Sequence, residues 1–152
     1  MSIRRTTSDD VALVLEQRLA FLRAVRGDDS VGDPSFVEAT RSFIDEETGS
    51  GRMHTWVAET TRCVGIISLL LWARVPRPFD DESRDGYIIN MYVEPGQRGR
   101  GLGRRLLDEC LASRMEFGVG RFFLHATDEG RPLYESSGFR PNPTWLEWTP
   151  RH

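Results

Sequence analysis

The chain has 152 residues, a formal net charge of −3 at pH 7, and apolar and charged fractions of 39% and 28%. This length predicts a single domain over residues 1–152 with a buried core, and the composition is that of a globular protein in water. The net negative charge argues against non-specific nucleic-acid binding, so no nucleic-acid partner is expected.

Neither an export signal nor a membrane span is indicated. The longest apolar run, residues 64–73, is far too short to cross a bilayer, and residues 1–5 lack the apolar region of a signal peptide. We therefore expect a cytoplasmic location and no membrane partner. Cys63 and Cys110 fall within a predicted strand and a predicted helix, which favours buried thiols over a disulfide.

The N-terminal part is predicted to form a strand and two helices. Residues 3–6 suit a short strand, and residues 7–10 suit an N-cap with acids in the first turn. Apolar residues at helical spacing define one face of the first helix: Val11, Val14, Leu15, Leu22 and Val25. Asp33 and Pro34 are typical of the N-cap and first residue of a second helix, which residues 49–51 end.

The remaining elements follow in a mixed order. Strands are predicted at 55–59, 63–72 and 87–93, a helix at 102–117 stopped by Gly118 and Gly120, a strand over 122–126, and a short helix at 133–137. The tail carries Trp145, Leu146 and Trp148 and is taken as the last strand. The order βααβββαβαβ predicts a mixed α/β (α+β) domain with a central sheet.

A glycine-rich turn joins the strand at 87–93 to the helix that begins near Leu102. Gly99, Gly101 and Gly103 stand at alternate positions, which lets backbone N–H groups turn inward as the helix begins. A helix N-terminus with unsatisfied N–H groups and a positive dipole end is an anion site, most often for phosphate. The turn therefore points to a phosphate-bearing ligand, and a turn without a ligand is the alternative.

Two common nucleotide sites are excluded by this loop. A Walker A loop ends in Gly-Lys-Ser/Thr, and the chain has no lysine, since all 20 basic residues are arginines. A dinucleotide fingerprint needs Gly-x-Gly-x-x-Gly after the first strand of its unit. Here the glycine spacing differs, and the loop lies well past the middle of the chain.

The loop resembles that of a known family, and a second motif strengthens the resemblance. Arg98-x-x-Gly101-x-Gly103 resembles the Gln/Arg-x-x-Gly-x-Gly/Ala pyrophosphate loop of the GNAT superfamily of acyl-CoA-dependent N-acyltransferases. Residues 132–139, Pro-Leu-Tyr-Glu-Ser-Ser-Gly-Phe, resemble the family's Leu-Tyr-x-x-x-Gly-Phe signature. Both motifs stand in the family's order with one β-prone run between them. The resemblance implies a mostly antiparallel central sheet flanked by helices.

The resemblance also implies how the donor, acetyl-CoA, is held, without a metal. The pyrophosphate loop corresponds to Arg98, Gly99, Arg100, Gly101, Leu102, Gly103 and Arg104. In the family, a bulge at the end of the preceding strand pairs with pantetheine and turns a main-chain N–H toward the acyl oxygen; the matching residues are Met91, Tyr92 and Val93. The family often has an asparagine where this chain has Thr127, whose hydroxyl would then be the group that contacts the pantetheine arm.

By the same resemblance, Tyr134 meets the leaving thiolate. An ordinary phenol has a pKa near 10 against about 8.5 for a thiol, so full proton transfer is uphill by about 2 kcal/mol. A hydrogen bond to the developing thiolate would assist without complete transfer.

The group that takes the proton of the amine is not identified by sequence. Lysine is excluded because the chain has none. Carboxylates and rings near the expected acceptor side are Glu46, Glu47, His54, Asp85 and Tyr87, each equally compatible with a surface or packing role. His125 follows a strand on the expected donor side, where a structural role is the better interpretation.

The resemblance thus predicts a transferase that moves an acetyl group from acetyl-CoA to a primary amine by direct attack. The acceptor is a small-molecule or peptide amine. The alternatives are a non-catalytic acyl-CoA-binding module and a protein lysine or N-terminal acetyltransferase. A larger acyl group and a homodimer are left open.

Two acidic loops, at 28–33 and 80–85, suggest that the acceptor carries a positive charge. Solvated loop charge is the alternative explanation for both clusters.

Overall fold

The computed structural model describes residues 1–27, 31–79 and 82–151. The strands are β1 (Ser2–Arg5), β2 (Met53–Glu59), β3 (Cys63–Ala73), β4 (Arg84–Val93) and β5 (Val119–Phe123). The helices are α1 (Val11–Arg26), α2 (Pro34–Gly49), α3 (Leu102–Ala112), α4 (Arg114–Phe117) and α5 (Arg131–Ser136), with 3₁₀ turns η1 (Ser8–Asp10) and η2 (Pro95–Gln97).

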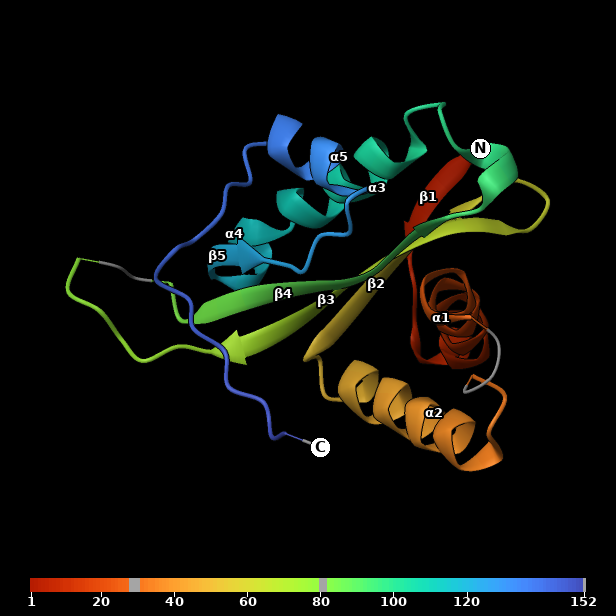
Figure 1. Cartoon of the computed structure of the whole chain (residues 1–152), viewed down its shortest axis with the longest axis horizontal. Coiled ribbons are helices and arrows are strands. Elements are labelled where there is room, and N and C mark those ends of the chain that lie inside the picture. The colour runs from red at the N-terminus through yellow and green to blue at the C-terminus, as the bar shows by residue number, and fades with distance from the viewer. Residues whose placement is uncertain (28–30, 80–81, 152) are drawn as a thin grey trace.

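The strands form one sheet in the order β1-β2-β3-β4-β5. Neighbouring strands are antiparallel except β4 and β5, which are parallel. Figure 1 shows α1 and α2 on one side of the sheet and α3, α4 and α5 on the other. The predicted fold class, a mostly antiparallel sheet flanked by helices, is confirmed.

The sheet separates two cores, and β3 contributes to both. Val64, Ile67 and Leu69 pack in the core under α3, while Cys63 and Ile66 pack in the core under α1 and α2. A strand with both faces buried needs a continuous apolar run rather than alternation, as the sequence of β3 has. The two cysteines are buried and not joined, as predicted, and burial raises the pKa of the Cys110 thiol to about 12.

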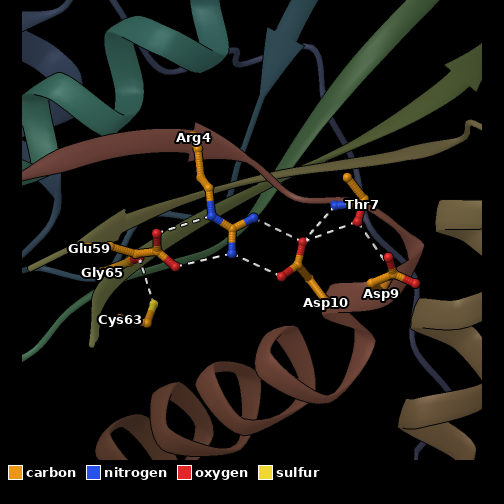
Figure 2. A network of polar contacts seen from close by, with 7 residues as sticks. All are labelled: Arg4, Thr7, Asp9, Asp10, Glu59, Cys63 and Gly65. Carbon is orange, nitrogen blue, oxygen red and sulfur yellow. Dashed lines mark hydrogen bonds and ion pairs between the residues drawn. The ribbon is translucent and has the colours of Figure 1, made fainter. Parts of the chain in front are cut away.

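The edge strand β1 is joined to both β2 and the start of α1 by one arginine (Figure 2). The Arg4 guanidinium donates to Glu59 at 3.1 Å and to Asp10 at 2.9 and 3.0 Å. Asp10 also accepts from the Thr7 backbone in a capping box. The hydrogen bonds from Arg4 lower the pKa of Asp10 to about 2. This network fixes where α1 begins and so how its later turns face the sheet.

The predicted helix over 102–117 is interrupted, and the next strand lies earlier than predicted. Ser113 Oγ donates to the Cys110 carbonyl at 2.6 Å, and the chain turns there between α3 and α4. Gly120, predicted to stop a helix, lies instead within β5. A Cβ at that position would be 1.9 Å from Nη1 of Arg74 and 3.0 Å from Cβ of Glu82, so glycine leaves room for the Arg74 side chain to cross the strand.

The tail is not a strand in the part of the chain that the structure describes, although the sequence order predicted one there. Residues 138–151 form no ladder with β5. Three prolines in this segment, Pro141, Pro143 and Pro150, cannot donate to a ladder. The tail instead packs through Trp145, whose ring centroid lies 5.9 Å from that of Phe123.

Candidate active site

A large opening arises because β5 pairs with only the first part of β4. Their register runs from Arg84 opposite Val119 to Tyr87 opposite Phe123, after which β4 continues to Val93 without a described strand on that side. The backbone N–H and C=O groups along this edge of β4 are therefore available to a ligand.

A bulge re-aims β4 within this unpaired stretch. Ile66 of β3 lies opposite Tyr92 and Ser68 lies opposite Ile89, so Ile67 faces two residues of β4. Asn90 at the bulge has φ of +59°, a conformation that asparagine tolerates better than most residues. The resemblance implied a bulge at 91–93, and the structure places it at residues 90–91.

The glycine-rich turn leads directly from β4 into α3. Gly99 and Gly101 have φ of +77° and +76°, and Gly101 is the N-cap of α3 without a side-chain cap. The N–H groups of residues 99–104 donate to no other described group. The Arg98 side chain donates through Nε to the Val93 carbonyl at 2.8 Å, which ties the turn to the end of β4.

Tyr134 of α5 points into the same opening from the other side. Its side chain is largely buried and its ring lies edge-on to Phe139, with centroids 5.8 Å apart. Burial raises the pKa of the phenol to about 12, so it stays protonated at neutral pH. The hydroxyl forms no hydrogen bond with another described group.

These features line one large groove of about 1200 Å³. The predicted donor-site residues that line it are Met91, Tyr92, Val93, Arg98, Gly99, Gly101, Leu102, Gly103, Thr127 and Tyr134. Arg100 and Arg104 do not line the groove, and Arg104 instead donates to Ser136 and Ser137 on α5. Thr127 Oγ1 accepts from Gly130 N at 3.1 Å, which holds the turn before α5. The roles of these residues stay predictions.

A smaller hollow of about 280 Å³ continues the groove between α1, α2 and the sheet. Its walls are mostly apolar: Phe36, Ala39, Thr40, Phe43, Ile44, Met53 and Ile89. Arg18 and Asn90 stand where the hollow and the large groove meet, since both side chains line both spaces.

Arg18 is held at this junction by a chain of buried polar groups. Its Nη1 donates to Asn90 Oδ1 at 2.8 Å, and Asn90 Nδ2 donates to Ser68 Oγ at 3.2 Å. Ser68 Oγ lies 2.8 Å from Thr55 Oγ1, so the polar chain crosses β4, β3 and β2. Ser68, Thr55 and Asn90 are at most 3% exposed.

Most of the candidate bases lie outside both spaces. Glu47 accepts from Arg52, and Glu46 is exposed on α2. His54 stacks on Phe117 at 4.0 Å, which packs it away from the groove, and burial lowers the pKa of its ring.

Asp85 is also committed elsewhere, because it forms ion pairs with Arg74 at 3.3 Å and Arg121 at 2.7 Å. Among the predicted candidates, Tyr87 and His125 do line the large groove, with ring centroids 5.9 Å apart.

The acidic loops give little support for a cationic acceptor. Residues 28–30 and 80–81 lie outside the described part of the chain. Asp33 caps α2 by accepting from Phe36 N at 3.2 Å, and Glu82 pairs with Arg114. With Asp85 paired as well, the described acids of both loops have structural roles.

Arg18 and Asn90, the two polar residues where the small hollow meets the large groove, were not selected from the sequence, although the sequence pattern around each is unusual. Arg18 lies four residues after Val14 and four before Leu22, on the face assigned to the core. A charge within an apolar helical stripe indicates either a buried partner or a ligand. Asn90 interrupts an otherwise apolar, β-prone run, which is typical of a bulge.

Comparison with known proteins assigns the family. Residues 51–141, more than half of the chain, match the acetyltransferase (GNAT) domain family. The chain belongs to the GNAT acetyltransferase family. The matched range contains β2 to α5 and so the bulge, the glycine-rich turn and Tyr134.

Solved GNAT structures superpose on nearly the whole chain. A GCN5-related N-acetyltransferase from Ralstonia eutropha JMP134 is 29% identical, with a TM-score of 0.82 over 97% of each chain. A predicted acetyltransferase from Clostridium acetobutylicum, solved with acetyl-CoA, has a TM-score of 0.87 over 97% of this chain and 95% of that one. Because the identity is 23%, this second similarity is evidence for the fold alone.

Curated relatives match over part of their length. The mycothiol acetyltransferase of Beutenbergia cavernae is 39% identical over 80 residues, which is 51% of this chain and 25% of that protein. Across the curated relatives, the match spans from a quarter to about half of their length.

Two further features, a membrane-spanning helix and a cluster of metal ligands, are absent from the described residues. No described helix has the length and apolar composition needed to cross a membrane. Within residues 1–27, 31–79 and 82–151, no three His, Cys, Asp or Glu side chains cluster as metal ligands.

Proposed function

We propose that this protein is an N-acetyltransferase that transfers an acetyl group from acetyl-CoA to a primary amine. The observation that carries the proposal is the continuity of the large groove. One opening is lined by the unpaired edge of β4, the glycine-rich turn before α3 and the protonated Tyr134. A donor, an acyl oxygen and a leaving thiolate could each meet their required partners within it.

The backbone supports binding of the donor at two places. The N–H groups of residues 99–104, at the positive end of α3, fit a pyrophosphate. The unpaired edge of β4 after Tyr87 offers strand-like hydrogen bonds to the amide groups of a pantetheine arm. The bulge at Asn90 turns the following backbone toward the position proposed for the acyl oxygen.

Tyr134 is proposed to stabilise the sulfur as the C–S bond breaks. With its pKa at about 12, full proton transfer to a thiolate of pKa near 8.5 is uphill by about 5 kcal/mol. The phenol therefore acts best as a hydrogen-bond donor whose strength grows as charge develops on sulfur. The proton that finally reaches the thiolate can come from the amine, which loses one as the N–C bond forms.

His125 is the strongest candidate to receive the proton of the amine. It lines the large groove beside Tyr87, and no described group forms a hydrogen bond with its ring. Imidazole is the commonest general base in enzymes. The sequence favoured a structural role for this residue, and its exposed position in the groove supports a chemical one instead.

A single assay tests the function. Purified protein should bind acetyl-CoA by calorimetry and release CoA thiol when amines are added, with N-acetylated products seen by mass spectrometry. Binding without release for every amine class would favour the non-catalytic module. Release with peptides alone would favour protein acetylation. Absence of binding would contradict the proposal itself. A larger acyl group, a cytoplasmic location and a homodimer stay predictions.

A further inference from the structure

Arg18 is a half-buried cation without an acidic partner in the described structure. Its described hydrogen bond goes to the neutral amide of Asn90, and its guanidinium also lies over the ring of Phe21 at 5.8 Å. Guanidinium has five N–H donors, and the bond to Asn90 uses one. Burial, with the charge of nearby Arg26, lowers the pKa of Arg18. A cation held this way gains most from an anion that enters the groove.

The polar chain behind Arg18 gives that cation a fixed direction. Asn90 accepts from Arg18 through Oδ1 and donates to Ser68 through Nδ2, which settles the orientation of its amide. Thr55 extends the chain into β2. Buried hydroxyls and amides are retained when every member is hydrogen-bonded, and such a network holds its end group in place.

The small hollow beside Arg18 selects for an apolar group. Its walls include two aromatic rings, Phe36 and Phe43, together with Ile44, Met53 and Ile89. Among the described residues that line it, none is acidic. Its volume of about 280 Å³ suits a hydrocarbon or aromatic side chain rather than a sugar with many hydroxyls.

We propose that the acceptor is an amine bearing a carboxylate next to an apolar side chain, as in an apolar α-amino acid. The carboxylate pairs with Arg18, the side chain enters the small hollow, and the amine faces the bulge of β4. The inference rests on the proposed function. In the reaction the neutral amine nitrogen bonds to the acetyl carbon, the C–S bond breaks, and the proton lost by nitrogen is passed to the departing thiolate, giving an N-acetyl amino acid and CoA thiol.

In the inferred acceptor the group that the site recognises is negatively charged, whereas the acidic loops suggested that a positively charged group is recognised. A carboxylate is favoured over a phosphate because the remaining wall of the site is apolar and the hollow is small. Glucosamine 6-phosphate and glucosamine therefore serve as the phosphate-bearing and neutral comparison pair.

The test compares matched amines in the same thiol-release assay. L-Phenylalanine and L-leucine should have kcat/KM values about 10- to 100-fold above those of their amides, the range expected for a hydrogen bond between charged groups. The amides have less basic amines, which works against this result and makes the comparison conservative. Equal values, or a larger gain for glucosamine 6-phosphate over glucosamine, would overturn the inference.

Variants assign the preference to Arg18. Arg18→Gln should bring the acid-to-amide ratio toward one, and Arg18→Lys should restore part of it. Asn90→Asp should also lower the ratio, because a carboxylate beside Arg18 would compete with the acceptor. Arg41→Gln is the matched control, since Arg41 lies on α2 outside the hollow and pairs with Glu38. A ratio unchanged in Arg18→Gln, with the fold intact by circular dichroism, would overturn the inference.

A binding measurement separates this inference from the proposed function. Calorimetry in the presence of CoA should show N-acetyl-L-phenylalanine binding more tightly than its amide, and Arg18→Gln should remove the difference. Tighter binding of the acid than of the amide, without turnover, would support the carboxylate site and contradict the transferase activity. Equal turnover of the acid and the amide would support the transferase activity and contradict the proposed carboxylate site. Neither binding nor turnover would contradict both.

Discussion

The two ends of the groove are built from different parts of the chain. The proposed donor end is mostly backbone: the unpaired edge of β4 and the N–H groups of residues 99–104, all within one short stretch of sequence. The proposed acceptor end is made of side chains from α1, α2, β2 and β4. Its central contact, between Arg18 and Asn90, joins residues 72 positions apart.

This difference gives a physical reason why a short motif can reveal the proposed donor end but not the proposed acceptor end. A pyrophosphate is the same in every acyl-CoA, and backbone groups bind it whatever the neighbouring side chains are. Acceptors differ in charge and shape, so side chains must recognise them. The family match begins at residue 51 and so leaves out α1 and α2, which carry most of the walls of the small hollow.

The largest expected effect lies in the donor end, at the sulfur. Tyr134→Phe should lower kcat by roughly 10²- to 10⁴-fold while the Kd for acetyl-CoA changes little, because the phenol acts on charge that appears only during reaction. Stopped assays of thiol release, with calorimetry on the same protein, measure both quantities. An unchanged kcat would reduce Tyr134 to a packing residue.

The next effect tests whether the glycine-rich turn binds through its backbone. Gly101→Glu should weaken acetyl-CoA binding by roughly 10- to 100-fold, because a side chain at φ of +76° strains the turn and a carboxylate opposes phosphate. Gly96→Glu is the matched control, because Gly96 has open space around it and lies outside the groove. Equal losses in the two variants would indicate a general charge effect instead.

A smaller effect tests the role of the acidic loop at the acceptor end. Asp33→Ala should lower the free energy of unfolding by about 1 kcal/mol, because α2 loses its N-cap, whereas Asp33→Ser should keep most of it. Urea unfolding measures this difference. A KM for cationic amines that rises equally in both variants would restore the view that these acids attract the acceptor.

The smallest effect concerns protonation at the donor end. Absorbance of ionised tyrosine should show one of the three phenols titrating near pH 12, and Tyr134→Phe should remove that step. The folded pKa lies above the ordinary value of 10, so the stabilising effect of the buried phenol is complete below pH 10. It should be lost as the pH rises from about 10 toward 12. Titration of all three phenols near pH 10 would show that Tyr134 is hydrated.

Local sequence was enough to predict most of the elements and the glycine-rich turn that joins β4 to α3. The apolar run of β3, the Asp33-Pro34 start of α2 and the spacing of Gly99, Gly101 and Gly103 each reflect constraints set by nearby residues. The predictions failed where distant residues intervene. Gly120 lies within β5, where the Arg74 side chain crosses it, and the tail packs through Trp145 instead of pairing with β5.

By itself, the sequence determined most of the order of elements as far as α5 and the position of the glycine-rich turn, because each depends on neighbours within a few residues. Tertiary structure alone decided that β4 and β5 diverge after Tyr87 and that Arg18 meets Asn90 beside an apolar hollow. The contact between Arg18 and Asn90 depends on how α1 and α2 pack against the sheet. Packing between distant segments is hard to predict from a single sequence.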